Sequence, residues 1–128
     1  MRLTIVLAVI LVAAGAGIAW LLLASEGARF GSVAEVVNAI NEGGIECTGR
    51  KVLSRGEPKE TGLCYVGSGE YEVDIYIFET VETRDDWLEG LRRVYDREVV
   101  VGPNWYLTTG HRPLSDRIAE TLGGEVTD

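Results

Sequence analysis

Apolar residues are concentrated at the start of the chain, where the run from Leu3 to Ala24 contains no charged side chain. At about 1.5 Å per helical residue, this run spans roughly 33 Å, close to the hydrocarbon thickness of a bilayer. It exceeds the apolar core of a typical signal peptide and closes on three leucines, residues 21–23. The pattern predicts a transmembrane anchor (or uncleaved signal) over residues 1–25, with residues 3–24 in the lipid bilayer. The alternative is a signal peptide removed after export.

The charges around this anchor predict its orientation. Arg2 and the amino terminus lie on the short side, and positive charge favours the cytoplasmic side of a membrane. We therefore expect a single-pass protein of the cell membrane whose carboxyl-terminal domain lies outside the cytoplasm. Small residues four positions apart also offer a face for homodimer formation, unless they are ordinary lipid-facing positions. They are Ala13, Gly15, Gly17 and Ala19.

Helical periodicity recurs three times after a short junction over residues 26–31. The first helix is expected to begin at a capping box formed by Ser32 and Glu35, and its inward positions are Val33, Val36, Val37 and Ile40. The second is expected to begin at Thr83, with an inner face of Trp87, Leu88, Leu91, Val94 and Tyr95. The third is expected to begin at Ser115 and carries Ile118, Ala119 and Leu122.

Strand patterns lie between these helices. Residues 71–77 alternate strictly, and residues 63–66 precede them across a Gly-Ser-Gly turn. Residues 51–54 form a weaker edge strand, and residues 98–101 and 105–108 flank a Gly-Pro-Asn turn. The predicted fold class is therefore α+β: an N-terminal transmembrane helix, then a domain over residues 32–128. That domain has an antiparallel sheet of about four to five strands with helices packed on one face.

The charge balance excludes one class of partner. Of the 20 acidic and 12 basic residues, only Arg2 lies before the apolar run of residues 3–24. The chain after that run carries 20 acidic and 11 basic residues, a net charge of −9. Such an acidic domain repels nucleic acid, so no nucleic-acid partner is expected.

The two cysteines, Cys47 and Cys64, are the only ones in the chain and form no CxxC motif. A zinc site needs about four ligands at short spacings, and the one histidine, His111, is distant in sequence. No metal or other cofactor is therefore expected. In an oxidising compartment such a pair usually forms one structural disulfide, and buried free thiols are the alternative.

Several of these stretches occur together in a familiar order. They are the cysteine pair, a strand ending in Phe78, a helix bearing Trp87, the Val-Gly-Pro-Asn-Trp sequence of residues 101–105, and residues 118–124. Across residues 45–124 the chain resembles small exported or membrane-anchored actinobacterial proteins of unknown function. Ten arginines against two lysines fit a high-GC genome of that kind. The resemblance implies no activity and no catalytic residue.

Two patterns offer candidate chemistry. His111, with a carboxylate, could serve a small hydrolase, although Ser115 near it is better explained as a helix cap and no GxSxG elbow is present. Acidic residues at 70, 72 and 74 could make a calcium-responsive module, but they lack the EF-hand pattern, and a solvated sheet face explains them better.

An aromatic and acidic patch is the more informative candidate. If the odd-numbered residues of the strand over residues 71–77 face the core, Glu72, Asp74, Tyr76 and Phe78 share the outward face. Outward aromatic side chains framed by acids are typical of a partner-binding surface. The alternative, which the sequence favours over an open patch, is that a helix or the carboxyl-terminal segment covers this end of the sheet.

The sequence as a whole favours a membrane-anchored extracytoplasmic domain that binds another envelope or membrane protein. This expectation rests on the anchor, the small size of the domain and the acidic surface. No catalytic residues are assigned, and the hydrolase and calcium hypotheses remain as alternatives.

Overall fold

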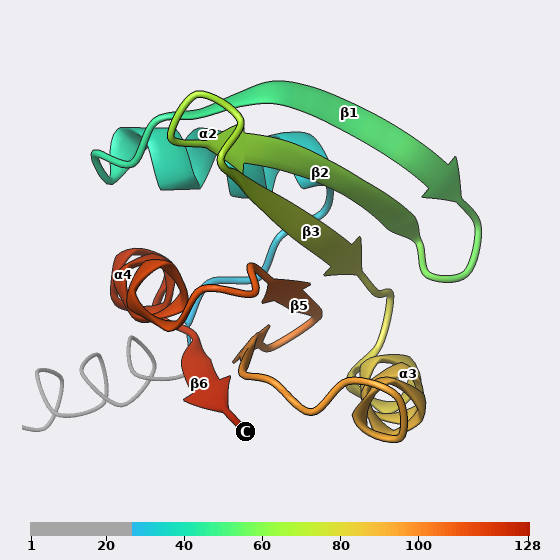
Figure 1. Cartoon of the computed structure of the whole chain (residues 1–128). Helices are drawn as coiled ribbons and strands as arrows, with labels where there is room; N and C mark the ends of the chain where they lie inside the picture. The colour runs from blue at the N-terminus through green and yellow to red at the C-terminus, as the bar shows by residue number, and fades with distance from the viewer. Residues whose placement is uncertain (1–26) are drawn as a thin grey trace, which may run out of the picture.

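The computed structural model describes residues 27–128 (Figure 1). Their elements, in chain order, are α2 (Val33–Glu42), β1 (Cys47–Arg55), β2 (Glu60–Val66), β3 (Tyr71–Ile77), α3 (Val81–Arg92), β4 (Val99–Gly102), β5 (Trp105–Thr108), α4 (Arg112–Leu122) and β6 (Glu125–Thr127). The anchor predicted over residues 1–25, with its small-residue face, lies outside the described residues. Between residues 27 and 128, none of the helices combines the length and the apolar character that crossing a membrane requires.

The sheet confirms the predicted α+β class and antiparallel pairing, but it is larger than expected. It has six strands in the order β1-β2-β3-β5-β4-β6 (Figure 1). The additional strand is β6, a segment of three residues that pairs with β4 and is too short to show periodicity. The predicted edge strand is confirmed as β1, although it begins earlier, at Cys47.

Helix α2 forms as its sequence predicts. The Ser32 hydroxyl accepts a hydrogen bond from the Glu35 amide (3.2 Å), and the Glu35 carboxylate accepts one from the Gly31 amide. Each bond satisfies an amide near the helix start that has no partner within the helix. The apolar stripe of α2 is buried against the sheet, as predicted, at Val33, Val36, Val37 and Ile40.

The larger core lies on one face of the sheet, beneath α2 and α4. The odd-numbered residues of β3 that were expected to face the core, Val73, Ile75 and Ile77, are all fully buried there. They share this core with Trp105 and Leu107 of β5. The strict alternation of β3 therefore identified the buried face correctly.

Helix α3 contradicts the expectation that all helices pack on one face. Its half-buried Leu88 and Leu91 contact a second cluster formed by Phe78, Val99 and Tyr106. Figure 1 shows α3 and α4 on opposite sides of β4 and β5. The physical reason is that β4 and β5 are apolar at consecutive positions, so both of their faces must be covered.

Two predicted helix starts were wrong. Helix α3 is capped by Thr80, whose hydroxyl accepts from the Thr83 amide (3.1 Å), so Thr83 itself lies within the first turn. Helix α4 is capped by His111, whose Nδ1 accepts from the Leu114 amide (3.4 Å). Ser115, expected to be the cap, is instead fully buried.

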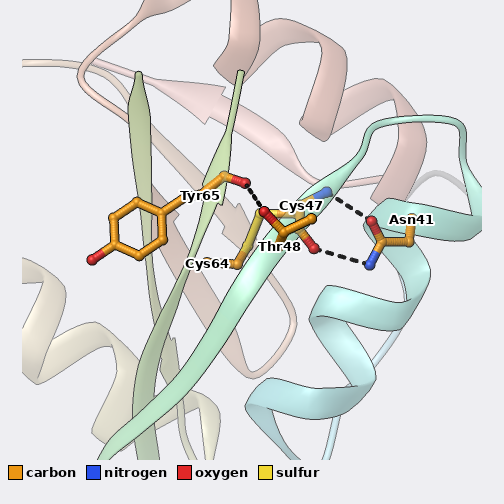
Figure 2. The surroundings of a disulfide bond; sticks show 5 residues. All are labelled: Asn41, Cys47, Thr48, Cys64 and Tyr65. Atoms are coloured by element: carbon orange, nitrogen blue, oxygen red, sulfur yellow. Dashed lines mark hydrogen bonds between the residues drawn. A yellow bond between two sulfur atoms is a disulfide. The ribbon is translucent and has the colours of Figure 1, made fainter. Parts of the chain in front are cut away.

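The predicted disulfide between Cys47 and Cys64 is confirmed and joins β1 to β2 (Figure 2). The side chain of Asn41 in α2 forms two hydrogen bonds to the backbone of Cys47. Its Oδ1 accepts from the Cys47 amide (2.7 Å), and its Nδ2 donates to the Cys47 carbonyl (3.2 Å). The bond and the amide therefore fix the start of the edge strand β1 against α2.

Asn104, in the turn between β4 and β5, is a buried polar hub. Its Nδ2 donates to the carbonyl oxygens of Phe30 (2.6 Å) and Phe78 (3.1 Å), and its Oδ1 accepts from the Phe30 amide (3.0 Å). The Asn104 carbonyl also accepts from the Phe78 amide (2.8 Å). One residue thereby joins the segment before α2, the end of β3 and the β4–β5 turn.

Trp105 strengthens the same connection. Its Nε1 donates to the carbonyl of Ala28 (2.8 Å), and its ring lies 5.7 Å from that of Phe30, centroid to centroid. From Ala28 to Phe30, the predicted junction is therefore bonded to the domain rather than acting as a free linker.

We expect Asn104→Ala to lower the free energy of unfolding by about 2–4 kcal/mol, because it removes the partners of the buried Phe78 carbonyl and of the partly buried amide and carbonyl of Phe30. Urea titration followed by circular dichroism measures the loss. Asn38→Ala, at an exposed position of α2, is the matched control. Equal losses in the two variants would show that the hub does not stabilise the fold.

Removing the disulfide is expected to lower the free energy of unfolding by about 3 kcal/mol, because the bond closes a loop between residues 17 apart. The measurement compares urea midpoints with and without reductant. A Cys47→Ala/Cys64→Ala double variant should be insensitive to reductant. An unchanged midpoint for the reduced natural protein would contradict the prediction.

Candidate functional site

An open hollow lies between α3 and the sheet, and we call it the α3 groove. It has a volume of about 430 Å³ and is lined by Tyr76, Asp86, Trp87, Gly90, Leu91, Val94 and Tyr106. Six of these seven residues are apolar, aromatic or glycine, and Asp86 supplies the one carboxylate. A largely apolar hollow with a single charged group resembles a binding site more than a solvated surface.

The wall of the α3 groove follows from residue spacing in and just after α3. Trp87, Gly90, Leu91 and Val94 are three or four positions apart, so they occupy one side of the helix. Trp87 is 41% exposed and Val94 is 86% exposed. The wall is open at Gly90, where an added Cβ would meet nothing within 4 Å.

The floor of the α3 groove is a row of aromatic rings. Tyr76 and Tyr106, paired across β3 and β5, stack with ring centroids 4.7 Å apart. Phe78 lies 5.4 Å from Tyr106 and 6.5 Å from Trp87, again between centroids. These contacts hold the exposed Trp87 in place on one side and leave its other side accessible.

The predicted binding patch is therefore only partly accessible. Tyr76 is half-buried and lines the α3 groove, but Phe78 is 1% exposed and belongs to the core beneath α3. Phe78 does lie with Tyr76 and Tyr106 on the face away from the main core, but it is not accessible there, because α3 covers it; for this residue the alternative that a helix covers this end of the sheet is right. Glu72 is exposed and Asp74 is half-buried.

Glu72 and Asp74 line a second, more polar hollow of about 470 Å³ next to the α3 groove. Asp74 lies two positions before Tyr76, on the same face of β3. Burial, then a hydrogen bond with Glu72 and the charge of Glu72, raises the pKa of Asp74 from 3.8 to about 7. Burial and the nearby carboxylates also raise the pKa of Tyr76, so its hydroxyl stays neutral.

His111 does not form a hydrolytic site in this arrangement. Its Nδ1 is occupied as the α4 cap, and its ring packs against Tyr71 with centroids 4.3 Å apart. Ser115 is fully buried, and its hydroxyl bonds to that of Thr109 (2.7 Å) and to Glu98 (3.5 Å). A nucleophile needs an accessible hydroxyl, so the geometry lends the hydrolase hypothesis no support.

The calcium hypothesis also gains no support from the geometry. Within residues 27–128, no three or more side chains of His, Cys, Asp or Glu are grouped so that they could hold a metal ion. The acidic residues of β3 instead border the α3 groove, where they contribute negative charge.

Sequence reasoning missed Asp86 and Gly90 and misjudged how exposed Trp87 and Val94 are. The available signal was a glycine in the middle of a predicted helix, flanked at helical spacing by large apolar residues. Gly90 lowers helix propensity, and the structure shows that it borders open space, since a Cβ added there would meet nothing within 4 Å.

The fold and this surface define the class of the protein only as an α+β domain with an antiparallel sheet of six strands. No protein-family model matches the chain, and comparisons with curated proteins and with solved structures found no match. The resemblance to actinobacterial proteins remains a prediction.

The raised pKa of Asp74 predicts a pH dependence of stability. The folded state holds a proton that the unfolded chain releases near pH 4, so stability falls as pH rises from about 4 to about 7. Asp74→Asn should therefore stabilise the protein at pH 8 by about 1 kcal/mol, a value discounted for screening of the half-exposed group.

Thermal unfolding of the natural protein and Asp74→Asn at pH 3.5 and pH 8 tests this expectation. The two should unfold at similar temperatures at the lower pH, and the variant should unfold at a higher temperature at pH 8. Glu42→Gln, exposed on α2, is the control for removing a charge. A destabilised Asp74→Asn at pH 8 would contradict the prediction.

Proposed function

We propose that this chain is a membrane-anchored, extracytoplasmic binding module that contacts another envelope or membrane protein through the α3 groove. The observation that carries the proposal is the exposed apolar stripe of Trp87 and Val94 beside an open hollow. No catalytic step is assigned to the domain.

The character of the α3 groove supports protein binding. Tryptophan and tyrosine are enriched among the residues that dominate interface energetics, especially in pockets that become fully desolvated. Trp87 already contacts Phe78 on one side, with ring centroids 6.5 Å apart, which lowers the side-chain entropy that binding would cost. A large aromatic group that is fixed and still 41% exposed suits recognition of a partner.

Two features support the proposed location of the domain outside the cytoplasm at a membrane: the disulfide, and the hydrogen bonds that join Ala28 and Phe30 to the domain. A buried disulfide between Cys47 and Cys64 is typical of proteins that fold in an oxidising compartment. Because Ala28 and Phe30 are hydrogen-bonded to the domain, a membrane anchor ahead of them would hold the domain close to the bilayer. A partner in the same membrane would then meet the α3 groove at a high effective concentration.

Proximity labelling of the full-length protein in its native membrane, with the label fused after Asp128, tests the proposal. We compare Gly90→Trp, which fills the α3 groove, with Gly90→Ala, which leaves it open and favours the helix. The natural protein and Gly90→Ala should enrich the same specific envelope protein. Gly90→Trp should lower that enrichment about tenfold, the effect of losing roughly 1.4 kcal/mol of binding energy.

The control for background is the anchor alone carrying the same label. Enrichment no greater than this control would argue against the binding module. Equal enrichment by Gly90→Trp and Gly90→Ala would leave protein binding in place but remove the α3 groove from it.

A further inference from the structure

The charges around the α3 groove are unbalanced. Asp86 lines it, and Glu72 and Asp74 line the adjoining hollow. None of these three carboxylates takes part in an ion pair among the described residues 27–128. Above about pH 7, where Asp74 has lost its proton as well, these acidic side chains without basic partners give the surface beside the apolar hollow a negative potential.

The basic side chains near this surface are engaged elsewhere. Arg93 pairs with Glu89 (3.3 Å), and Arg92 donates to Thr127 and to the carbonyl of Arg97. Arg97 lines the second hollow, but its Nη1 donates to the Gly110 carbonyl (3.0 Å). Arg97 keeps its positive charge beside the second hollow, but among the described residues neither it nor another arginine forms an ion pair with Asp86, Glu72 or Asp74, so these carboxylates can still pair with an incoming cation.

The spacing of the groups suits one kind of side-chain pair. Successive residues on one face of β3 are about 7 Å apart, so the Asp74 carboxyl lies one such step from the Tyr76 ring. A lysine or arginine could lay its aliphatic stem along Tyr76 and place its charged end at Asp74 or Glu72. The same cation can interact with the face of the aromatic ring.

We infer that the partner segment recognised by the α3 groove carries an apolar side chain next to lysine or arginine. The apolar side chain enters between Trp87, Leu91 and Tyr106, and the cation meets Asp86 on one side or Asp74 on the other. This inference rests on the proposed function and adds the chemistry of the partner.

Charge disfavours two other occupants. A second copy of the domain would bring a net charge of about −9 against an equally acidic surface, and an anionic lipid surface would be repelled in the same way. The chemistry of the hollow therefore favours a basic and apolar protein segment.

The test uses the full-length protein in nanodiscs of phosphatidylcholine and two fluorescent nonapeptides, GSKLKLKSG and GSELELESG. Anisotropy titrations at about pH 8, where the Asp74 carboxyl has lost its proton, should show binding of the lysine peptide at least about tenfold tighter than that of the glutamate peptide. Binding of the lysine peptide should weaken with added salt. Empty nanodiscs measure binding to lipid alone.

Charge-removing variants locate the contact. Asp86→Asn and Asp74→Asn should each weaken binding of the lysine peptide by about 3–10-fold and reduce its salt dependence. Glu42→Gln, on the far side of the domain, should leave both unchanged. Because Asp86 is exposed, its substitution does not disturb folding.

The outcomes separate this inference from the proposed function. Equal affinity for the two peptides, no binding of the lysine peptide, or variants indistinguishable from Glu42→Gln would overturn the partner chemistry. Protein binding through the α3 groove would still stand if Gly90→Trp abolished proximity labelling of a partner. If neither the natural protein nor any variant enriched an envelope protein above the anchor-only control, the proposed function would instead be overturned.

Discussion

The side-chain amide of Asn104 is the interaction on which the other parts of the domain depend. It is buried, and both of its ends are used: the nitrogen donates to Phe30 and Phe78, and the oxygen accepts from Phe30. A buried amide that lost these partners would carry the full cost of desolvation. Asn104 therefore holds three parts of the chain in place relative to one another: the segment before α2, the end of β3 and the β4–β5 turn.

This constraint reaches the α3 groove, the proposed binding surface, through Phe78. Its backbone is held by Asn104 at both the amide and the carbonyl, immediately after β3. Thr80 then caps α3, so the helix starts at a fixed point and crosses to the second face of the sheet. The aromatic row from Tyr76 to Trp87 forms because of this placement. Polar bonds buried at one end of the sheet thus determine the shape of an apolar hollow on its face.

The sequence predicted those features in which local pattern and burial agree. The alternation of Val73, Ile75 and Ile77 identified the main core, and the capping box at Ser32 identified α2. It failed where contacts depend on strand order: β5 lies between β3 and β4, so the stacking of Tyr76 on Tyr106 has no local signal. Of the candidate patch, Glu72, Asp74 and Tyr76 lie beside a hollow, whereas Phe78 is covered because α3 uses the opposite face.

The packing of α3 explains why its exposed stripe is suited to binding rather than to folding. None of the helical residues of α3 is fully buried, and Leu88 and Leu91 alone supply its partly buried aliphatic contacts with the sheet cluster. Trp87 is 41% exposed and Val94 is 86% exposed, so covering their remaining apolar surface is worth about 5 kcal/mol at the usual value for apolar area, before the cost of association is subtracted. In the folded domain this apolar surface stays exposed to water, because Gly90 carries no side chain that could fill the hollow between Trp87 and Val94. A partner that supplies the missing side chain gains that free energy without rearranging the helix or the sheet.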